Sequence, residues 1–232
     1  MGFGHGKNID VYANGYDLTG YFDSIDQGGT AKTAETTTFG STADTFVAGT
    51  KNGTLSAEGF FDGAANAVDA ILSAALAGAV NWLWWPQNDN IGNYGYGMAA
   101  LETSYSVKGS ISAAVRVAVA AQSNVGIERV RSLHALGSES ATGNAAGQDD
   151  SAASTGGGSG YIECTTASGT LACTIEHSTD NSTFTTLASF TNITAANKSE
   201  RIIFAGTVNR YVRAKWTITG GPFTFAVGIH RN

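Results

Sequence analysis

One stretch constrains the fold of this chain most: residues 62–85, DGAANAVDAILSAALAGAVNWLWW, carry helical periodicity within a sequence otherwise patterned for strands. The apolar residues at helical spacing are Val68, Ile71, Leu72, Ala75 and Leu76. They form one stripe of a helix. We therefore predict a single α-helix over about 63–77, with Asp62 as its N-cap and Gly78 as the left-handed residue that ends it. Such a stripe needs a sheet to cover.

Most of the remaining chain consists of short alternating segments separated by turn residues, a pattern typical of antiparallel β-structure. Asn14-Gly15 predicts a tight turn between two early strands, and Lys108-Gly109-Ser110 predicts a hairpin between strands 98–108 and 110–122. We also predict a hairpin around Ser168-Gly169. Further strands are expected at 55–61, 80–85, 126–136, 183–190, 200–204, 211–219 and 223–229. The predicted class is mainly β: an N-terminal sandwich or barrel with one flanking helix, and a small C-terminal antiparallel sandwich.

A composition break at 138–158, rich in Ser, Gly and Ala, predicts a linker. The expected domains are therefore 1–137 and 159–232. Residues 1–138 carry 7 Lys/Arg against 12 Asp/Glu, and the whole chain has a net charge of −6. An acidic first domain argues against a surface that grips nucleic acid, because phosphate contacts need Lys and Arg. Only 14% of residues are charged, which favours broad surfaces covered by other copies of the chain.

Residues 30–54 are rich in Thr and contain isolated apolar residues instead of a periodic face. Thr favours extended backbone. We interpret this stretch as a long segment between strands that either covers the core or contacts a second chain.

Two further patterns suggest surfaces. Trp82 and Trp84 occupy alternating positions, which suggests one buried face of a strand, and Trp85 lies on the other face. This aromatic strand is expected to form core or subunit interface, with a sugar-binding cluster as the alternative. In strand 110–122, one face is apolar and the other carries small residues with a single charge. The members of that second face are Ser112, Ala114, Arg116, Ala118 and Ala120. A smooth face of this kind suits close packing or the lining of a channel.

The sequence contains no recognisable set of catalytic residues. None of the four histidines, His5, His134, His177 and His230, has metal-ligand spacing, and His177-Ser178-Thr179-Asp180 reads as a strand end and a turn. Asp149-Asp150 lies in the expected linker, where nothing is expected to hold the pair. We expect no enzyme activity, no metal and no cofactor.

Cys164 and Cys173 are equidistant from the turn at Ser168-Gly169, so they are expected to face each other across the strands. A disulfide is then geometrically possible, and two reduced cysteines are the favoured alternative. The chain opens without an apolar leader segment, and no run approaches the roughly 20 apolar residues of a membrane span. We therefore expect synthesis in a cytoplasm and no membrane partner.

The run from Ile9 to His134 resembles the tail tube (major tail) proteins of long, non-contractile-tailed bacteriophages. The resemblance is carried by the early strand pair, the segment ETTTFGSTADTFVAGTKNGTLSAEGFFD, the single helix and the closing long strands. Residues 159–232 resemble the small Ig-like or jelly-roll domains that decorate many such tubes, in the phrases IEHSTDNSTFTTLASF and RYVRAKW.

The resemblance implies a structural virion protein, made in the bacterial host cytoplasm, that self-assembles into stacked hexameric rings. Its implied partners are copies of itself, the tape-measure protein, tail-end proteins and genomic DNA that passes through the lumen without specific binding.

The resemblance also assigns roles to residues. The inter-ring contact loop comprises Glu35, Thr37, Phe39, Thr45, Phe46 and Val47, within 35–54. The lumen or core sheet comprises Ser112, Ala114, Arg116 and Ala118. Subunit packing is assigned to Trp82, Trp84 and Trp85, and a possible surface-ligand contact to Tyr211 and Trp216. The alternative functions are a capsid decoration or virion surface protein, and a carbohydrate-binding module.

Overall fold

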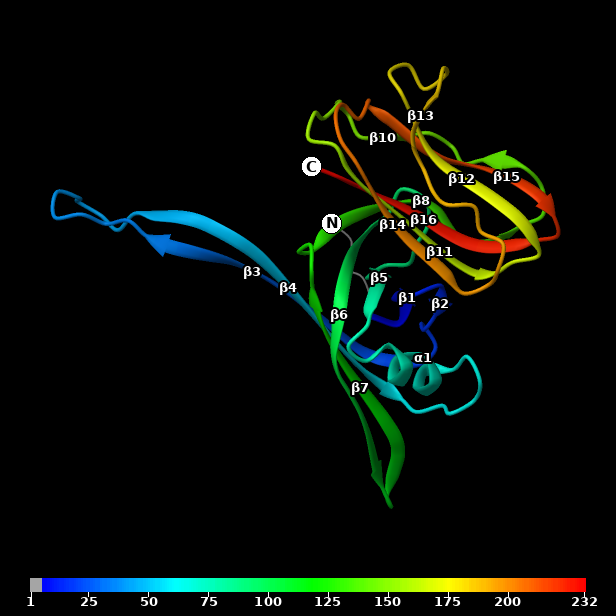
Figure 1. The fold of residues 1–232 in the computed structure, drawn as a ribbon, viewed down its shortest axis with the longest axis horizontal. Coiled ribbons are helices and arrows are strands. Elements are labelled where there is room, and N and C mark those ends of the chain that lie inside the picture. Colours follow the sequence, from blue (N-terminus) through cyan, green and yellow to red (C-terminus); the bar gives the residue numbers. More distant parts are fainter. Residues whose placement is uncertain (1–5) are drawn as a thin grey trace. The chain divides into compact units, whose positions relative to one another are not determined.

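The computed structural model describes residues 6–232, and their fold is mainly β with one α-helix (Figure 1). The predicted class is confirmed. The described residues form two compact units. Unit 1 contains the described residues up to Gly20 together with Asn81–Gly97 and Glu128–Asn232, and unit 2 contains Tyr21–Val80 and Met98–Ile127. Strands β5 (Ala79–Trp85) and β6 (Tyr94–Ser110) each contribute residues to both units.

Unit 1 holds two antiparallel sheets. The first has the order β14-β11-β16-β8-β6-β5-β1-β2, and the second has the order β10-β15-β12-β13, with β9 also paired to β15. The bounds of the strands not yet given are β1 Asp10–Ala13, β2 Tyr16–Asp17, β8 Glu128–Glu139, β9 Gly143–Asn144, β10 Gln148–Asp149, β11 Gly158–Thr166, β12 Gly169–Ser178, β13 Thr185–Ser189, β14 Lys198–Phe204, β15 Tyr211–Gly220 and β16 Phe223–Arg231. A short 3-10 helix, Gly6–Asn8, precedes β1.

The two sheets of unit 1 share one apolar core. Ile162 and Phe225 from the first sheet and Ile175 and Trp216 from the second are buried in the same cluster. Alternating inward side chains from two facing antiparallel sheets define a β-sandwich. The C-terminal sandwich is therefore confirmed.

The predicted turn at Asn14-Gly15 is confirmed, since both residues have positive φ (50° and 83°) between β1 and β2. The predicted hairpin at Ser168-Gly169 is wrong. Strand β11 pairs with β14 and β16, whereas β12 pairs with β13 and β15, so the chain crosses from one sheet to the other there. A hairpin and a crossing between sheets share the same alternation and turn signal, so spacing alone could not separate them.

The segment 138–158, predicted as a linker, carries the end of β8 and the short strands β9 and β10. Both short strands pair with β15. The division into domains at 137 and 159 remains a prediction.

Unit 2 consists of β3 (Phe22–Glu35), β4 (Phe46–Phe60), β7 (Ala113–Ser123) and the distal part of β6, paired in the order β3-β4-β7-β6, with helix α1 (Val68–Ala75). One face of the sheet buries Leu55, Ala57, Val117 and Val119. These residues lie in paired positions, Leu55 near Ala121 and Ala57 opposite Val119, so they share a face.

Helix α1 is shorter than predicted and its caps differ. Val68, Ile71 and Leu72 form its buried stripe, as expected, whereas Leu76 is half exposed. Asp62 accepts a hydrogen bond from the Ala64 N–H (2.9 Å) in a turn before the helix, and Ala67 occupies the cap position. The left-handed residue after the helix is Ala77, not Gly78. The Asp62 carboxylate bonds within the turn at 62–64 and does not cap the helix, and the helix begins only at Val68.

Candidate assembly interface

The first candidate surface is a two-stranded ribbon made by the distal halves of β3 and β4. Residues 28–51 of this hairpin are exposed except Ser41, which is half exposed, and Figure 1 shows the two strands extending away from the rest of unit 2. The expected loop at 30–54 is therefore mostly strand. The threonines favour an extended backbone. Both faces of the ribbon are exposed to solvent, so the sequence shows no apolar alternation from which these strands could be predicted.

The far end of the ribbon is ordered by hydroxyl contacts. The Thr36 N–H donates to the Thr45 carbonyl (2.7 Å), and the Thr45 N–H donates to Thr37 Oγ1 (3.1 Å). Thr38 and Ser41 close the turn through a backbone bond and their hydroxyl groups. The threonines of this segment thus hold the turn that presents its apolar side chains.

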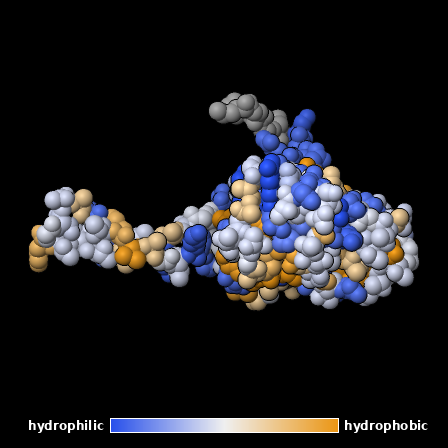
Figure 2. Space-filling model, turned by 90° about the horizontal axis from the view of Figure 1, so that it is seen from above, coloured by the Kyte–Doolittle hydropathy of each residue, from blue (hydrophilic) through white to orange (hydrophobic). Residues whose placement is uncertain are grey.

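Several apolar side chains of this ribbon are exposed to solvent. Phe39 is 115% exposed, Phe46 59% and Val47 56%. Figure 2 shows apolar residues along the ribbon and at its far end. Glu35, also assigned to the contact loop, pairs with Phe46 at the end of β3. All six residues assigned to an inter-ring contact therefore lie together on the ribbon, at or near its tip.

Both edges of the ribbon are open among the described residues. Strand β3 pairs only with β4, and β4 pairs with β7 only from Thr54 to Phe60. A two-stranded hairpin is at best marginally stable in water on its own, and an open strand edge is a template for another strand. The ribbon therefore has the features of a segment that is completed by a partner.

The second candidate surface is the solvent-exposed face of the unit 2 sheet, which we call the small-residue face. It spans four strands, because directly paired residues share a face. Its members are Ser24, Asp26, Ser56, Glu58, Phe60, Ser104, Ser106, Lys108, Arg116, Ala118 and Ala120. The predicted residues Ala114, Arg116 and Ala118 lie in β7, whereas Ser112 lies in the β6–β7 turn. That turn is Ile111-Ser112, not Lys108-Gly109-Ser110, since Ser110 pairs with Ala113.

Arg116, the single charge that the sequence placed on this face, is neutralised. Its guanidinium donates two hydrogen bonds to Asp23, Nη1 to Oδ2 at 2.9 Å and Nη2 to Oδ1 at 2.6 Å, and it lies 5.1 Å from the Phe60 ring centroid. The paired arginine lowers the pKa of Asp23. The face therefore offers no free arginine to a passing polyanion. Its remaining charged members are Asp26 and Glu58, which are negative, and Lys108, which is positive.

The tryptophans assigned to subunit packing are mostly core residues. Trp82 and Trp85 are fully buried, and Trp85 packs with Tyr12, 5.7 Å between ring centroids. They have no surface left to offer a second subunit. Trp84 is half exposed and stacks against Tyr96 at 5.4 Å.

The possible surface-ligand pair is not a paired surface site. Trp216 is 5% exposed, its Nε1–H donates to the Ala141 carbonyl (3.0 Å), and its ring meets His134 at 4.7 Å. Tyr211 is half exposed and lies under Arg210, 5.0 Å from ring centroid to guanidinium. A sugar stacks only on an aromatic ring whose face is exposed, and the ring of Trp216 is buried.

No catalytic constellation emerges among residues 6–232. Asp180 accepts hydrogen bonds from the Ser178 hydroxyl and from the Ser182 and Thr183 N–H groups, which form a turn, as predicted, and lower the pKa of Asp180 to about 2. No group of three metal-ligating side chains and no helix long and apolar enough to cross a membrane occurs in this part of the chain. His5 lies outside the described residues.

Sequence reasoning missed one charged cluster. Asp149 and Asp150, expected to be unsupported, are both held by arginines: Asp149 by Arg210 (2.6 Å), and Asp150 by Arg131 (2.5 Å) and Arg231 (2.6 Å). These arginines lie 19, 61 and 81 positions from the acids they hold, so no local motif linked them to the acids.

Comparison with known proteins gives weak similarities only. No protein-family model and no curated protein sequence matches the chain. Among solved structures, the tail of an empty gene transfer agent particle with C6 symmetry is 16% identical, with a TM-score of 0.43 over 54% of this chain and 97% of that one. The Dit protein of phage SPP1, described as a hub adsorption apparatus protein, is 11% identical, with a TM-score of 0.36 over 96% and 98%. A phage p2 baseplate chain is 10% identical, with a TM-score of 0.34 over 97% of both chains. Similarity at this level cannot carry an assignment.

Proposed function

We propose that this protein is a structural subunit of a bacteriophage tail that self-assembles into stacked hexameric rings and forms the tube through which DNA is ejected. The observation that carries the proposal is the ribbon of residues 28–51. It is exposed on both faces, open at both edges and tipped with Phe39 and Phe46. An ordered segment of this kind gains most of its stabilisation from a neighbouring subunit.

The small-residue face supplies the second requirement of a tube, which is a wall that passing DNA does not bind. Ser and Ala side chains expose little apolar area, and Arg116 is paired with Asp23. The exposed carboxylates of Asp26 and Glu58 repel phosphate and outnumber the one lysine of this face, Lys108. We propose that this face lines the lumen and that the ribbon contacts the adjacent ring. Repeated heterologous contacts that do not close on themselves produce a filament.

Electron microscopy of the purified protein at high concentration tests the proposal, and tubes of uniform diameter are expected. A shortened variant replaces residues 31–51 with Asn-Gly, so that the paired residues Thr30 and Asn52 are joined by a tight turn. This variant should keep its circular dichroism spectrum and melting temperature but form no tubes.

A matched control is Ile203→Ser in β14, which removes an exposed apolar side chain (74%) outside the ribbon and should leave the tubes intact. Tubes formed by the shortened variant would refute the contact role of the ribbon. Persistent monomers or trimers of the unaltered protein would favour a capsid decoration protein. The carbohydrate-binding alternative is less well supported, since Trp82, Trp85 and Trp216 are buried and the half-exposed Trp84 lies against Tyr96.

A further inference from the structure

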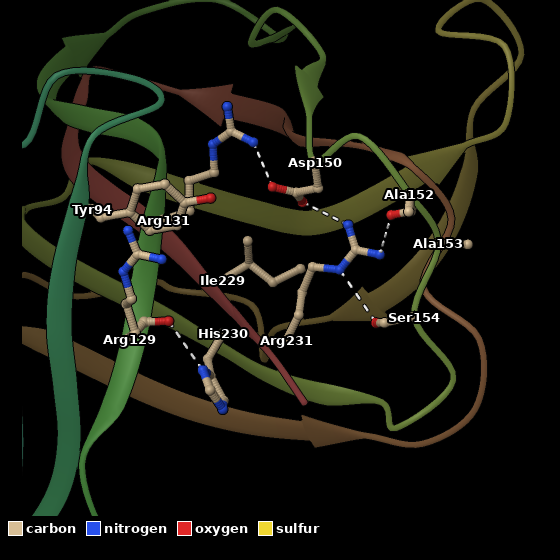
Figure 3. A pocket seen from close by; sticks show the side chains of 10 residues that line it. All are labelled: Tyr94, Arg129, Arg131, Asp150, Ala152, Ala153, Ser154, Ile229, His230 and Arg231. Carbon is tan, nitrogen blue, oxygen red and sulfur yellow. Dashed lines mark hydrogen bonds and ion pairs between the residues drawn. The ribbon is translucent and has the colours of Figure 1, made fainter.

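A cationic cavity lies in unit 1, where strands β6, β8 and β16 meet the segment after β10. Its volume is about 350 Å³. Figure 3 shows Arg129, Arg131 and Arg231 around it, with Tyr94 and His230 beside them and Asp150 as the single acidic residue. Tyr94, Arg131 and Ile229 are directly paired across three adjacent strands, so the cavity stands on a rigid base.

The arginines of this cavity outnumber the acid that faces them. Asp150 uses both carboxylate oxygens, Oδ1 for Arg131 and Oδ2 for Arg231, and all three side chains are nearly buried, with 12–15% of their surface exposed. Arg231 is further satisfied by the carbonyl groups of Ala152 (3.1 Å) and Val208 (2.8 Å). The neighbouring Asp149 is already paired with Arg210. One carboxylate therefore balances two guanidinium groups.

Arg129 adds a third positive charge with no acidic partner among the described residues. Its guanidinium is exposed and lies 3.7 Å from the centroid of the Tyr94 ring. Stacking on the ring fixes the plane of the guanidinium while its N–H donors remain open. Arg131 also retains one unsatisfied donor, because its buried Nε–H has no hydrogen-bond partner in the protein. The cluster thus carries excess positive charge, and the exposed N–H donors of Arg129 are available to an acceptor.

We propose that this cavity binds an oxyanion, the carboxylate or phosphate group of a small ligand, with Arg129 as the residue that contacts it. A planar guanidinium matches both groups through paired N–H donors. The cavity has room for a ligand of about the size of a sugar acid or sugar phosphate. This function is separate from assembly, since none of the residues involved belongs to the ribbon or to the small-residue face.

Ligand-observed NMR tests this site whether or not the protein assembles. Phosphorus line broadening follows inorganic phosphate, and saturation-transfer difference signals follow glucuronate, with methyl glucoside as the uncharged comparison. We expect one or both anions to bind with a Kd of about 1–10 mM and methyl glucoside to give no signal. The tighter of the two anions identifies the group that the site prefers.

Substitutions locate the binding. Arg129→Ala should weaken binding about tenfold, and Arg129→Lys should retain an intermediate affinity because it keeps the charge but loses the planar donors. The matched control is Arg210→Ala, which removes another exposed arginine stacked on a tyrosine but already paired with Asp149, and it should change the affinity less than about twofold. No binding of either anion, or equal losses in Arg129→Ala and Arg210→Ala, would overturn the proposal.

Discussion

The ribbon of unit 2 and the strands of unit 1 are both antiparallel β-structure, yet they use it in opposite ways. Seven consecutive residues of β11, from Gly158 to Cys164, are buried, so this strand is covered on both faces. In the ribbon, hardly any residue from 28 to 51 is covered on either face. Antiparallel pairing in unit 1 therefore builds a buried, stabilising core. In the ribbon of unit 2, the same kind of pairing leaves both faces exposed for contact with another molecule. Substitutions in the two regions should separate these roles.

The largest effect is expected at the buried charge cluster of unit 1. Glu128 accepts hydrogen bonds from Ser159 (2.6 Å), Tyr161 and Arg201 (3.0 Å from Nε). Burial alone would raise the pKa of Glu128, but these donors lower it overall. Arg201→Met would leave the carboxylate buried without its counter-charge and should reduce the free energy of unfolding by about 3–5 kcal/mol, measured by urea denaturation.

The double variant Arg201→Met with Glu128→Gln is the control, because it removes both charges and should recover much of the loss. Since the native pKa of Glu128 is lowered, the contribution of this carboxylate to stability should be present above pH 4.5 and be lost as the pH falls further. A single variant as stable as the unaltered protein would contradict a core held together by this cluster.

An intermediate effect is expected at Glu102 in unit 2, and it should depend on pH. This carboxyl group is fully buried, neither of its oxygens has a hydrogen-bond partner, and burial raises its pKa to about 7. Below pH 4.5 it is neutral in both the folded and the unfolded state. As the pH rises from 4.5 to 7, the unfolded state ionises first, so the folded state loses stability.

Glu102→Gln should therefore be more stable than the unaltered protein at pH 8, by about 1–2 kcal/mol, and equal to it near pH 4. Chemical denaturation at the two pH values measures the difference. Glu58→Gln is the control, because it removes a carboxylate from an exposed position of the same sheet. Equal stabilities of Glu102→Gln and the unaltered protein at both pH values would show that Glu102 reaches solvent.

The smallest effect on stability is expected at the ribbon tip. Phe39→Ala removes a fully exposed ring and should change the free energy of unfolding by less than about 0.5 kcal/mol. The matched substitution in the core of unit 1, Phe225→Ala, should cost about 3–5 kcal/mol. Thermal or urea unfolding compares them, and a large loss in Phe39→Ala would mean that the ribbon stabilises its own chain.

The sequence predicted the class and most strands because alternation and turn residues are local signals. The Asn14-Gly15 turn and strands β13 to β16 follow directly from them. Pairing partners are not local, so the crossing between sheets at Ser168-Gly169 was missed. The ribbon was missed as a strand pair for a different reason, which is that periodicity records burial, and the ribbon has almost none.

The residues of the candidate sites also fall into those that local sequence could predict and those that depend on tertiary contacts. The contact residues from Glu35 to Val47 could be proposed because the resemblance to tail tube proteins assigns a contact loop to this one continuous stretch. Trp216 was misjudged as a surface residue, since composition does not show that the Ala141 carbonyl and the His134 ring enclose it. The arginine cavity depends on side chains from four separated segments, which a single sequence cannot bring together.

The crossing between the two sheets has a consequence for the cysteines. Cys164 and Cys173, expected to face each other across a hairpin, belong to different sheets, and both are buried, unbonded thiols in the shared core. Burial raises the pKa of Cys164 to about 11 and that of Cys173 further. The thiolate is the reactive form, so the raised pKa values keep both groups unreactive, and burial keeps alkylating reagents from both sulfur atoms until the sandwich opens. The rate at which the two thiols are alkylated therefore measures how often the two sheets separate.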